Sequence, residues 1–108
     1  MIHYPKISVI IPVYNAELYF EKCLRSLFEQ TFGGIEFVFI NDNTPDNSFN
    51  ILENVLADYP DRKKQIKIIN NKYNIGSGAS RNIGLTVADG EYIVFCDSDD
   101  WCDLDLYQ

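Results

Sequence analysis

Apolar residues recur along the chain with two different spacings, and these spacings predict strands in alternation with helices. Runs rich in Val, Ile and Phe favour extended structure, because β-branched and aromatic side chains fit a pleated surface. The predicted strands are 6–15 (KISVIIPVYN), 35–41 (IEFVFIN), 66–70 (IKIIN) and 90–97 (GEYIVFCD). Apolar residues three and four positions apart indicate one face of a helix. The predicted helices are 16–30, 49–59 and 79–88.

Each predicted helix has an apolar face and a residue that ends it. Glycines at 33 and 34 stop the first helix, and Pro60 closes the second. The first helix is expected to bury Leu18, Cys23, Leu24, Leu27 and Phe28. The third helix has Ile83, Leu85 and Val87 among its apolar positions.

The order of these elements predicts an α/β fold. Strands that alternate with helices form a parallel sheet with helices on both faces and right-handed crossovers. We expect residues 1–108 to form one domain, a Rossmann-like sheet that is truncated after the fourth strand. Ligands of such sheets bind outside the carboxyl ends of the strands. The loops PVYN, NDNTPD, NNKYNIGSG and DSDDW each follow a strand, so all of them should meet at that edge.

Composition narrows the class of protein. The chain has 108 residues, 46% of them hydrophobic, and a formal net charge of -7. An acidic chain of this kind is unsuited to a nucleic-acid polymer, although a metal ion can bridge a single nucleotide to carboxylates. The first residues lack the features of a signal peptide, and no apolar run reaches the length that spans a bilayer. We therefore expect a cytoplasmic protein.

The cysteines do not suggest a metal site. Cys23, Cys96 and Cys102 have no CxxC spacing, and the single histidine, His3, is distant in sequence. A zinc site needs four ligands, so we expect these cysteines to be structural thiols.

Three carboxylates crowd the end of the fourth predicted strand, at Asp97, Asp99 and Asp100. Like charges about 4 Å apart repel by roughly 4 kcal/mol at an effective dielectric of 20, so such a cluster splays into water or shares a cation. An EF-hand loop would need Gly and Glu where Cys102 and Gln108 stand, and a DxDxT phosphatase would need Thr at 101. A solvated loop and a cation site remain open on charge alone.

A DxD at a strand end is compatible with a division of labour between its acids. In an extended backbone Asp97 and Asp99 lie on the same side, about 7 Å apart at ~3.3 Å per residue. One can bind a hydroxyl pair while the other binds Mg²⁺ or Mn²⁺, ions that prefer oxygen ligands and often hold phosphate. The cluster therefore suggests a diphosphate site that includes a metal ion.

The remaining loops have both structural and functional interpretations. The glycines of NIGSGASRNIG do not match GxGxxG, because Arg81 stands at the last glycine position. They either shape a turn or place Arg81 near a helix start, where phosphate is favoured. Asp46 or Asn47 is expected to cap the second helix. Asp42 stands earlier, at a strand end, where it could accept a hydrogen bond from a ligand N–H, and Pro12 ends or interrupts the first strand.

With these loops identified, the sequence resembles the family 2 glycosyltransferases of the GT-A fold. SVIIPVYN, FVFINDNTPDNS, NIGSGASRNIGL and GEYIVFCDSDDW match successive motifs of that family in order, across nearly the whole chain. The resemblance implies an inverting transferase that uses a nucleotide-diphosphate sugar, commonly UDP-linked, together with Mn²⁺ or Mg²⁺. The acceptor would be a hydroxyl of a glycan, a lipid or another molecule in polysaccharide biosynthesis.

The resemblance also implies roles for individual residues. Asp42 would read the uracil ring beside the backbone of Pro12, Val13 and Tyr14. Arg81 would lie near the base and the diphosphate, Asp97 would bind the ribose, and Asp99 would bind the metal. Ser98 is counted with the nucleotide-sugar-binding residues, whereas Asp100 and Trp101 would face the sugar. The family often has DDGS where this chain has Asn41-Asp42-Asn43-Thr44, so Asn41 replaces a carboxylate.

The resemblance finally predicts what the fragment does alone. The family's general base lies in the second half of the catalytic domain, which is expected beyond Gln108 together with the acceptor site. We therefore expect residues 1–108 to bind the donor without catalysing transfer, and to form a homodimer through the cut edge of the sheet. The full-length protein would be peripheral at the inner membrane face. A non-catalytic nucleotide-binding module is the alternative, and a sugar-phosphate nucleotidyltransferase is disfavoured because PVYNAELYF lacks its glycine-rich basic loop.

Overall fold

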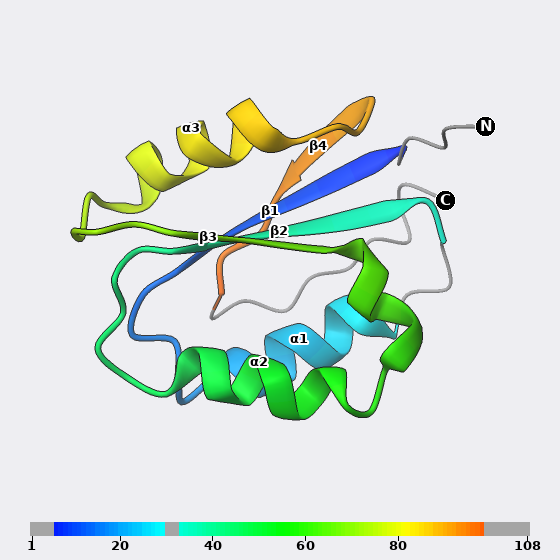
Figure 1. Cartoon of the computed structure of the whole chain (residues 1–108), viewed down its shortest axis with the longest axis horizontal. Helices are drawn as coiled ribbons and strands as arrows, with labels where there is room; N and C mark the ends of the chain where they lie inside the picture. Colours follow the sequence, from blue (N-terminus) through cyan, green and yellow to red (C-terminus); the bar gives the residue numbers. More distant parts are fainter. Residues whose placement is uncertain (1–5, 30–32, 99–108) are drawn as a thin grey trace.

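A computed structural model describes residues 6–29 and 33–98 of the chain. Strands and helices alternate along it, and a short 3₁₀ helix, η1, precedes the third strand (Figure 1). In chain order the elements are β1 (Ile7–Val13), α1 (Phe20–Phe28), β2 (Ile35–Asn41), α2 (Ser48–Leu56), η1 (Pro60–Gln65), β3 (Ile66–Asn70), α3 (Ser77–Val87) and β4 (Tyr92–Phe95).

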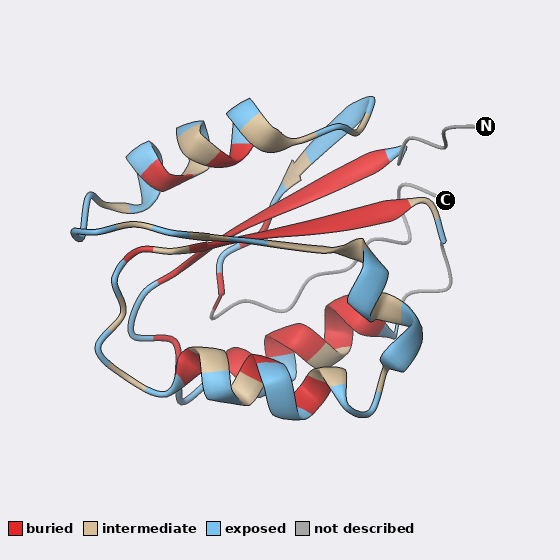
Figure 2. Cartoon of the chain, viewed as in Figure 1, coloured by how far each residue is buried: buried red, intermediate tan, exposed pale blue. Residues whose placement is uncertain are grey.

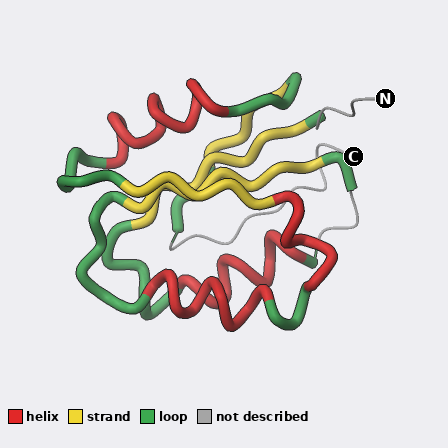
Figure 3. The backbone as a smooth tube through the Cα atoms, in the orientation of Figure 1, coloured by secondary structure: helices red, strands yellow, loops and turns green. Residues whose placement is uncertain are grey.

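The strands form a parallel sheet in the order β3-β2-β1-β4. β1 lies inside the sheet, where Ile7 pairs with Ile35 of β2 on one side and with Tyr92 of β4 on the other. α1 and α2 cover one face and α3 covers the other, as Figures 1 and 3 show. The predicted α/β fold with a parallel sheet is confirmed.

The core has two parts because the sheet is buried on both faces. Every residue of β1 is buried, and so is nearly all of β2 (Figure 2). Residues at odd positions of β1, such as Val9 and Ile11, belong to the larger cluster, which also contains Phe20 and Leu24 of α1. Ile10 points to the opposite face and clusters with Val38, Ile40 and apolar residues of α3. This two-sided burial explains why β1 and β2 are nearly continuous apolar runs.

α3 packs closely on the sheet through Gly84. A Cβ atom at this position would lie 2.5 Å from Cγ2 of Ile10. A glycine here therefore lets the helix approach β1 more closely than any side chain would allow. The same helix bears Arg81, so its seating on the sheet positions a predicted site residue.

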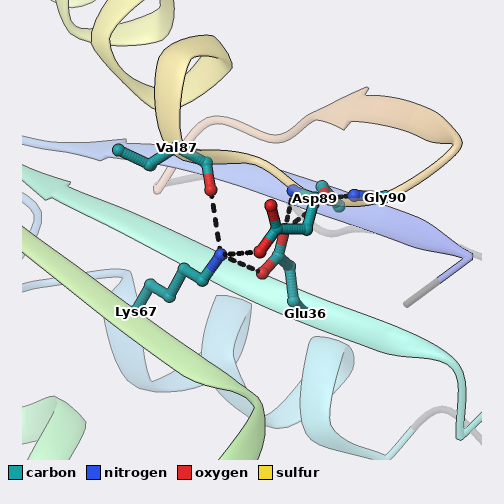
Figure 4. A network of polar contacts seen from close by, with 6 residues as sticks. Glu36, Lys67, Val87, Asp89 and Gly90 are labelled. Atoms are coloured by element: carbon teal, nitrogen blue, oxygen red, sulfur yellow. Dashed lines mark hydrogen bonds and ion pairs between the residues drawn. The ribbon is translucent and has the colours of Figure 1, made fainter. Parts of the chain in front are cut away.

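A polar network joins the amino-terminal edge of the sheet to the turn after α3 (Figure 4). Lys67 Nζ lies 2.8 Å from Oε1 of Glu36 and 2.7 Å from Oδ2 of Asp89. Glu36 also accepts hydrogen bonds from the Ser8 hydroxyl and the Asp89 N–H, both at 2.6 Å. Burial alone would raise the pKa of Glu36, but Lys67 and the other donors lower it below its usual value. Burial alone would lower the pKa of Lys67, but its contacts with Asp89 and Glu36 raise it above its usual value.

Several boundaries and exposures differ from the sequence-based prediction. α1 begins at Phe20, because residues 17–19 form a turn closed by hydrogen bonds from Tyr19 N and Phe20 N to the Ala16 carbonyl. Leu18 was expected on the buried face but is 86% exposed in this turn. Leu85 is also exposed, since α3 buries only the stripe that faces the sheet. η1 was not predicted, because its sequence PDRKKQ carries no apolar period.

β4 is shorter than predicted and is an outer strand of the described sheet. Tyr92, Ile93 and Phe95 are exposed on it. These apolar side chains are the surface on which the predicted self-association would depend, and the association itself stays a prediction.

Cys23 and Cys96 lie within the described residues. Cys23 is a buried thiol, whose Sγ donates a hydrogen bond to the Asp97 carbonyl at 3.7 Å. The prediction of a free thiol is wrong for Cys96, which takes part in a disulfide bond. Cysteine spacing alone does not reveal such pairing. Within the described ranges, none of the helices has the length and apolar character needed to span a bilayer.

Candidate functional site

The loops that follow the strands meet at the carboxyl edge of the sheet, at the left of Figure 1 for β1, β2 and β3. They enclose a cavity of about 370 Å³. Its lining comes from the ends of β1, β2 and β4 and from α3. The lining residues are Pro12, Val13, Tyr14, Asn15, Ala16, Tyr19, Asp42, Ser77, Arg81, Asp97 and Ser98.

All of the predicted nucleotide-sugar-binding residues lie on this one cavity. The prediction missed Asn15, Ala16, Tyr19 and Ser77, which line it too. Ser77 could have been found from sequence, because it is the first residue of a helix that follows a glycine-rich loop. Tyr19 could not, because it was assigned to a helix that begins one residue later. Asp99, Asp100 and Trp101 lie outside the described residues.

Asp42 is buried at the end of β2, where three donors hold its carboxylate. Oδ1 accepts hydrogen bonds from Ile75 N at 2.8 Å and from Asn71 Nδ2 at 3.1 Å. Oδ2 accepts one from Gly76 N at 2.9 Å. Gly76 has a φ of 90°, a conformation that favours glycine and turns the loop back toward this acid. The β3–α3 loop therefore fixes the orientation of Asp42 in the cavity wall.

Asparagines shape the loops next to Asp42. Asn15 and Asn43 have φ angles of 52° and 56°, in the left-handed region that asparagine tolerates better than most residues. Asn41, where the family often has an acid, donates to Oδ1 of Asn70 at 3.0 Å and accepts from Thr44 N at 2.9 Å. Its amide thus joins the ends of β2 and β3 and supports the loop, an arrangement that needs both a donor and an acceptor.

Arg81 and Asp97 form an ion pair on the cavity wall, with 2.7 Å between Nη2 and Oδ1. The guanidinium carbon also lies 5.9 Å from the centre of the Phe95 ring, within the range of a cation–π contact. About a third of the Arg81 side chain and half of the Asp97 side chain are exposed. The pair places a cation and a carboxylate side by side in the cavity, a contact that sequence reasoning did not anticipate.

The N-cap of α2 is Asn47, as one of the two predicted alternatives had it, but its side chain makes no capping hydrogen bond. Asp46, one residue earlier, is instead an acceptor for donors of two loops. Its Oδ1 accepts a hydrogen bond from Ser48 N at 3.2 Å, at the first residue of α2. It also accepts from the hydroxyls of Thr44 and Ser48, and its Oδ2 accepts from Glu17 N in the preceding loop. Partial burial opposes ionisation, but these donors lower the pKa of Asp46 below its usual value.

The donor set around the cavity is suited in type to a hard divalent cation. Carboxylate oxygens are the ligands that Mg²⁺ and Mn²⁺ prefer, and Asp97 brings one such group to the cavity. In the described residues, however, no three or more His, Cys, Asp or Glu side chains cluster closely enough to hold a metal ion. The predicted ligand, Asp99, stands outside them.

The fold and cavity together define a class of protein. A parallel sheet with polar loops at its carboxyl edge, a glycine-rich turn and a helix that begins at the cavity is the arrangement of nucleotide-binding α/β proteins.

Comparison with known proteins identifies the family. The sequence model of glycosyl transferase family 2 matches residues 8–108, and the chain belongs to this family. An uncharacterized glycosyltransferase of Haemophilus influenzae is 42% identical over 97 residues, which are 90% of this chain and 37% of the relative. The minor teichoic acid biosynthesis protein GgaB of Bacillus subtilis is 40% identical over 95 residues, 86% of this chain and 10% of GgaB.

Solved structures agree with this assignment. The crystal structure of S. aureus TarS 1–349 in complex with UDP-GlcNAc matches with a TM-score of 0.82 and 35% identity, over 94% of this chain and 29% of that one. The chain therefore spans little more than a third of these relatives at most. The predicted family and GT-A fold are confirmed.

Proposed function

We propose that this chain binds the nucleotide-sugar donor of an inverting glycosyltransferase and that the donor is a UDP-sugar. The observation that carries the proposal is the convergence of Asp42, Arg81 and Asp97 on one cavity at the carboxyl edge of the sheet. Membership of glycosyl transferase family 2 and the likeness to a UDP-GlcNAc complex support it. A non-catalytic nucleotide-binding module remains the alternative, and transfer activity of a longer protein would distinguish the two.

The hydrogen-bonding capacity of Asp42 supports uracil as the base. A carboxylate has about four acceptor positions, and three are taken by Ile75 N, Asn71 Nδ2 and Gly76 N. One position is left, on Oδ2. The Watson–Crick edge of uracil presents a single N–H, whereas that of guanine presents two adjacent donor groups. Guanine would therefore leave one donor without an acceptor, a penalty of about 1–3 kcal/mol.

The other residues have roles that follow from their chemistry. In this proposal the Asp97 carboxylate accepts hydrogen bonds from the ribose hydroxyls, while Arg81 holds Asp97 in place and lends positive charge to the diphosphate. α3 begins at Ser77 on the cavity wall, so its first N–H groups also favour an anion there. Pro12, Val13 and Tyr14 flank the base, and Ser98 lies beside the ribose.

The transfer step requires groups beyond those of the donor site. An acceptor hydroxyl attacks the anomeric carbon while the diphosphate leaves, and a general base takes the hydroxyl proton. We assign this base and the acceptor site to the further length that the relatives have. Bound Mn²⁺ or Mg²⁺, with Asp99 as its proposed ligand, would offset the negative charge of the departing diphosphate. The acceptor is proposed to belong to polysaccharide biosynthesis, on the analogy of GgaB. Cytoplasmic location and a peripheral position at the membrane are parts of the same proposal.

Calorimetry tests the donor site directly. We expect the chain to bind UDP in the presence of Mn²⁺, and Asp99→Ala to lose the metal-dependent part of the affinity. Asp61→Ala removes an exposed carboxylate that is not part of the cavity lining and should bind UDP like the wild type. Undetectable or metal-independent binding of UDP by folded protein would contradict the proposal.

The same calorimetry, carried out with other nucleotides, tests the choice of base. GDP should bind at least about fivefold more weakly than UDP, the lower limit set by one unsatisfied donor of about 1 kcal/mol. dTDP keeps the single N–H but lacks the 2′-hydroxyl, so it tests the ribose contact of Asp97 separately. Equal affinity for UDP and GDP would refute the assignment of Asp42 to a single-donor base.

A further inference from the structure

Two loops meet beside the cavity, but only one of them forms its rim. The first loop, residues 14–19, follows β1 and contributes Tyr14, Asn15, Ala16 and Tyr19 to the lining. The second loop, residues 42–47, follows β2, and apart from Asp42 it does not line the cavity. Thr44 and Asp46 of this second loop accept hydrogen bonds from the backbone of the first loop.

Apolar packing does little to hold the first loop. Ala16 is its only buried residue, and Leu18 and Tyr19 are exposed. The loop also contains Asn15 in the left-handed conformation, which is unfavourable for a residue with a side chain even though asparagine tolerates it. A segment of this kind needs polar contacts to stay in one conformation.

Thr44 and Asp46 supply such contacts across 29 residues of sequence. The Asn15 N–H donates to Oγ1 of Thr44 at 2.9 Å, and the Glu17 N–H donates to Oδ2 of Asp46 at 3.1 Å. The Thr44 hydroxyl in turn donates to Oδ1 of Asp46 at 2.8 Å. The two bonds bracket Ala16, so they fix the backbone on either side of the buried point of the loop.

The arrangement exceeds what a helix cap requires. At the start of α2, whose N-cap is Asn47, Ser48 N needs one acceptor, and Oδ1 of Asp46 provides it. Oδ2 of Asp46 is not needed for this and accepts its hydrogen bond from Glu17 N of the first loop. The donors around Asp46 keep it ionised and therefore a pure acceptor at neutral pH. Asparagine at this position would offer one acceptor oxygen where aspartate offers two.

We infer that Thr44 and Asp46 are positioning residues that set the cavity wall formed by Tyr14, Asn15 and Ala16, and thereby the affinity for the donor nucleotide. They act through the first loop and touch no ligand. The inference rests on the proposed function, because it names residues that tune the same site. The Thr44–Asp46 hydrogen bond makes them a unit, so losses from removing each should not add.

The test measures UDP binding to Thr44→Val, Asp46→Asn and the double variant. Thr44→Val removes the acceptor for Asn15 N with little change of shape. Each single variant should weaken UDP binding about two- to tenfold, the range for one lost hydrogen bond. The double variant should bind UDP little more weakly than the single variant that has the lower affinity. Thr86→Val and Asp61→Asn make the same chemical changes at exposed positions outside the cavity lining and should leave affinity unchanged.

Amide spectra separate positioning from general damage. The N–H signals of Asn15 and Glu17 should shift in the variants while those of β1 and β2 stay in place, and Thr44→Ser, which keeps the hydroxyl, should restore UDP affinity. Unchanged affinity in folded variants whose Asn15 and Glu17 signals have moved would overturn the inference, as would an equal loss in the controls.

Measurements on the wild-type protein interpret two further results, a lack of UDP binding and a failure of the variants to fold. If it binds no UDP, the proposed function fails, whereas normal binding with unaffected variants refutes only the positioning role. If the variants do not fold, hydrogen exchange in the wild type decides, because UDP should slow exchange at Asn15 and Glu17. Exchange there that is unaffected by bound UDP would overturn the inference.

Discussion

Replacing Gly84 by alanine should destabilise the protein even though alanine is the better helix former. Gly84 lies inside α3, where its Cα faces β1. A Cβ added there would lie 2.5 Å from Cγ2 of Ile10 and 3.3 Å from both its Cγ1 and Cδ1. Ile10 is fully buried between Val38, Ile40 and α3, so it has little room to move aside.

The magnitude follows from two opposed effects. Overpacking of a close-packed core destabilises by about 1–3 kcal/mol, while glycine-to-alanine in a helix interior stabilises by up to about 1 kcal/mol. Gly78 of the same helix provides the matched control, because a Cβ there would meet nothing within 4 Å. Because Gly78 is the second residue of α3, alanine gains less helix propensity there than in the interior, and the difference between the two variants is a lower limit to the overpacking of about 1–3 kcal/mol.

Thermal unfolding followed by circular dichroism measures this difference. In a domain of this size each 1 kcal/mol shifts the midpoint by about 4–8 °C, so Gly84→Ala should unfold several degrees below Gly78→Ala. Equal midpoints would show that α3 can move away from β1 at no cost, and would refute the account of how Arg81 is seated.

Two other predictions concern polar pairs at opposite edges of the sheet. Because the folded pKa of Glu36 is lowered, its contribution to stability is present above its ordinary pKa and is lost as pH falls through the folded value. Urea unfolding between pH 7 and pH 3 should therefore show a smaller acid-dependent loss in Glu36→Gln than in the wild type, and parallel curves would contradict this. At the cavity, Arg81→Met should weaken UDP binding several-fold, because Asp97 loses a partially exposed ion pair of about 1 kcal/mol or less. Arg81→Lys should restore only part of the affinity, and calorimetry that finds full affinity in Arg81→Met would exclude a role for the pair.

The fold was predictable because its determinants are local. The inner strands, β1 and β2, are short apolar runs. The alternation of such runs with helical periods specifies a parallel sheet, and the loops gather at its carboxyl edge. The exposure of Leu18 was not predictable in this way. Its spacing fits the helix face, but the chain turns at residues 17–19 and α1 starts only at Phe20. Helix starts depend on such turns, which periodicity does not reveal.

The gathering of the site residues was also predictable, but their contacts were not. Asp42 and Asp97 stand just after strands and Arg81 lies in the second turn of α3, so topology brings them to one edge. That the β3–α3 loop donates to Asp42, and that Asp46 reaches Glu17, depends on backbone directions in loops far apart in sequence. The left-handed asparagines were the available signal. An Asn one or two residues after a strand end favours the turn that makes such contacts.

The contacts divide the cavity into a rigid half and an adaptable half. Asp42 is 2% exposed and held by three donors, so a base bound as proposed would meet a carboxylate that is already oriented. Asp97 and Arg81 are exposed enough to exchange their mutual bond for bonds to a ligand. Preorganised groups discriminate between ligands because a mismatch leaves them unsatisfied, whereas exposed ion pairs reorganise with little loss. If the cavity is the donor site that we propose, selection of the base should therefore reside in Asp42 and its loop, and accommodation of the ribose and diphosphate in the Arg81–Asp97 pair.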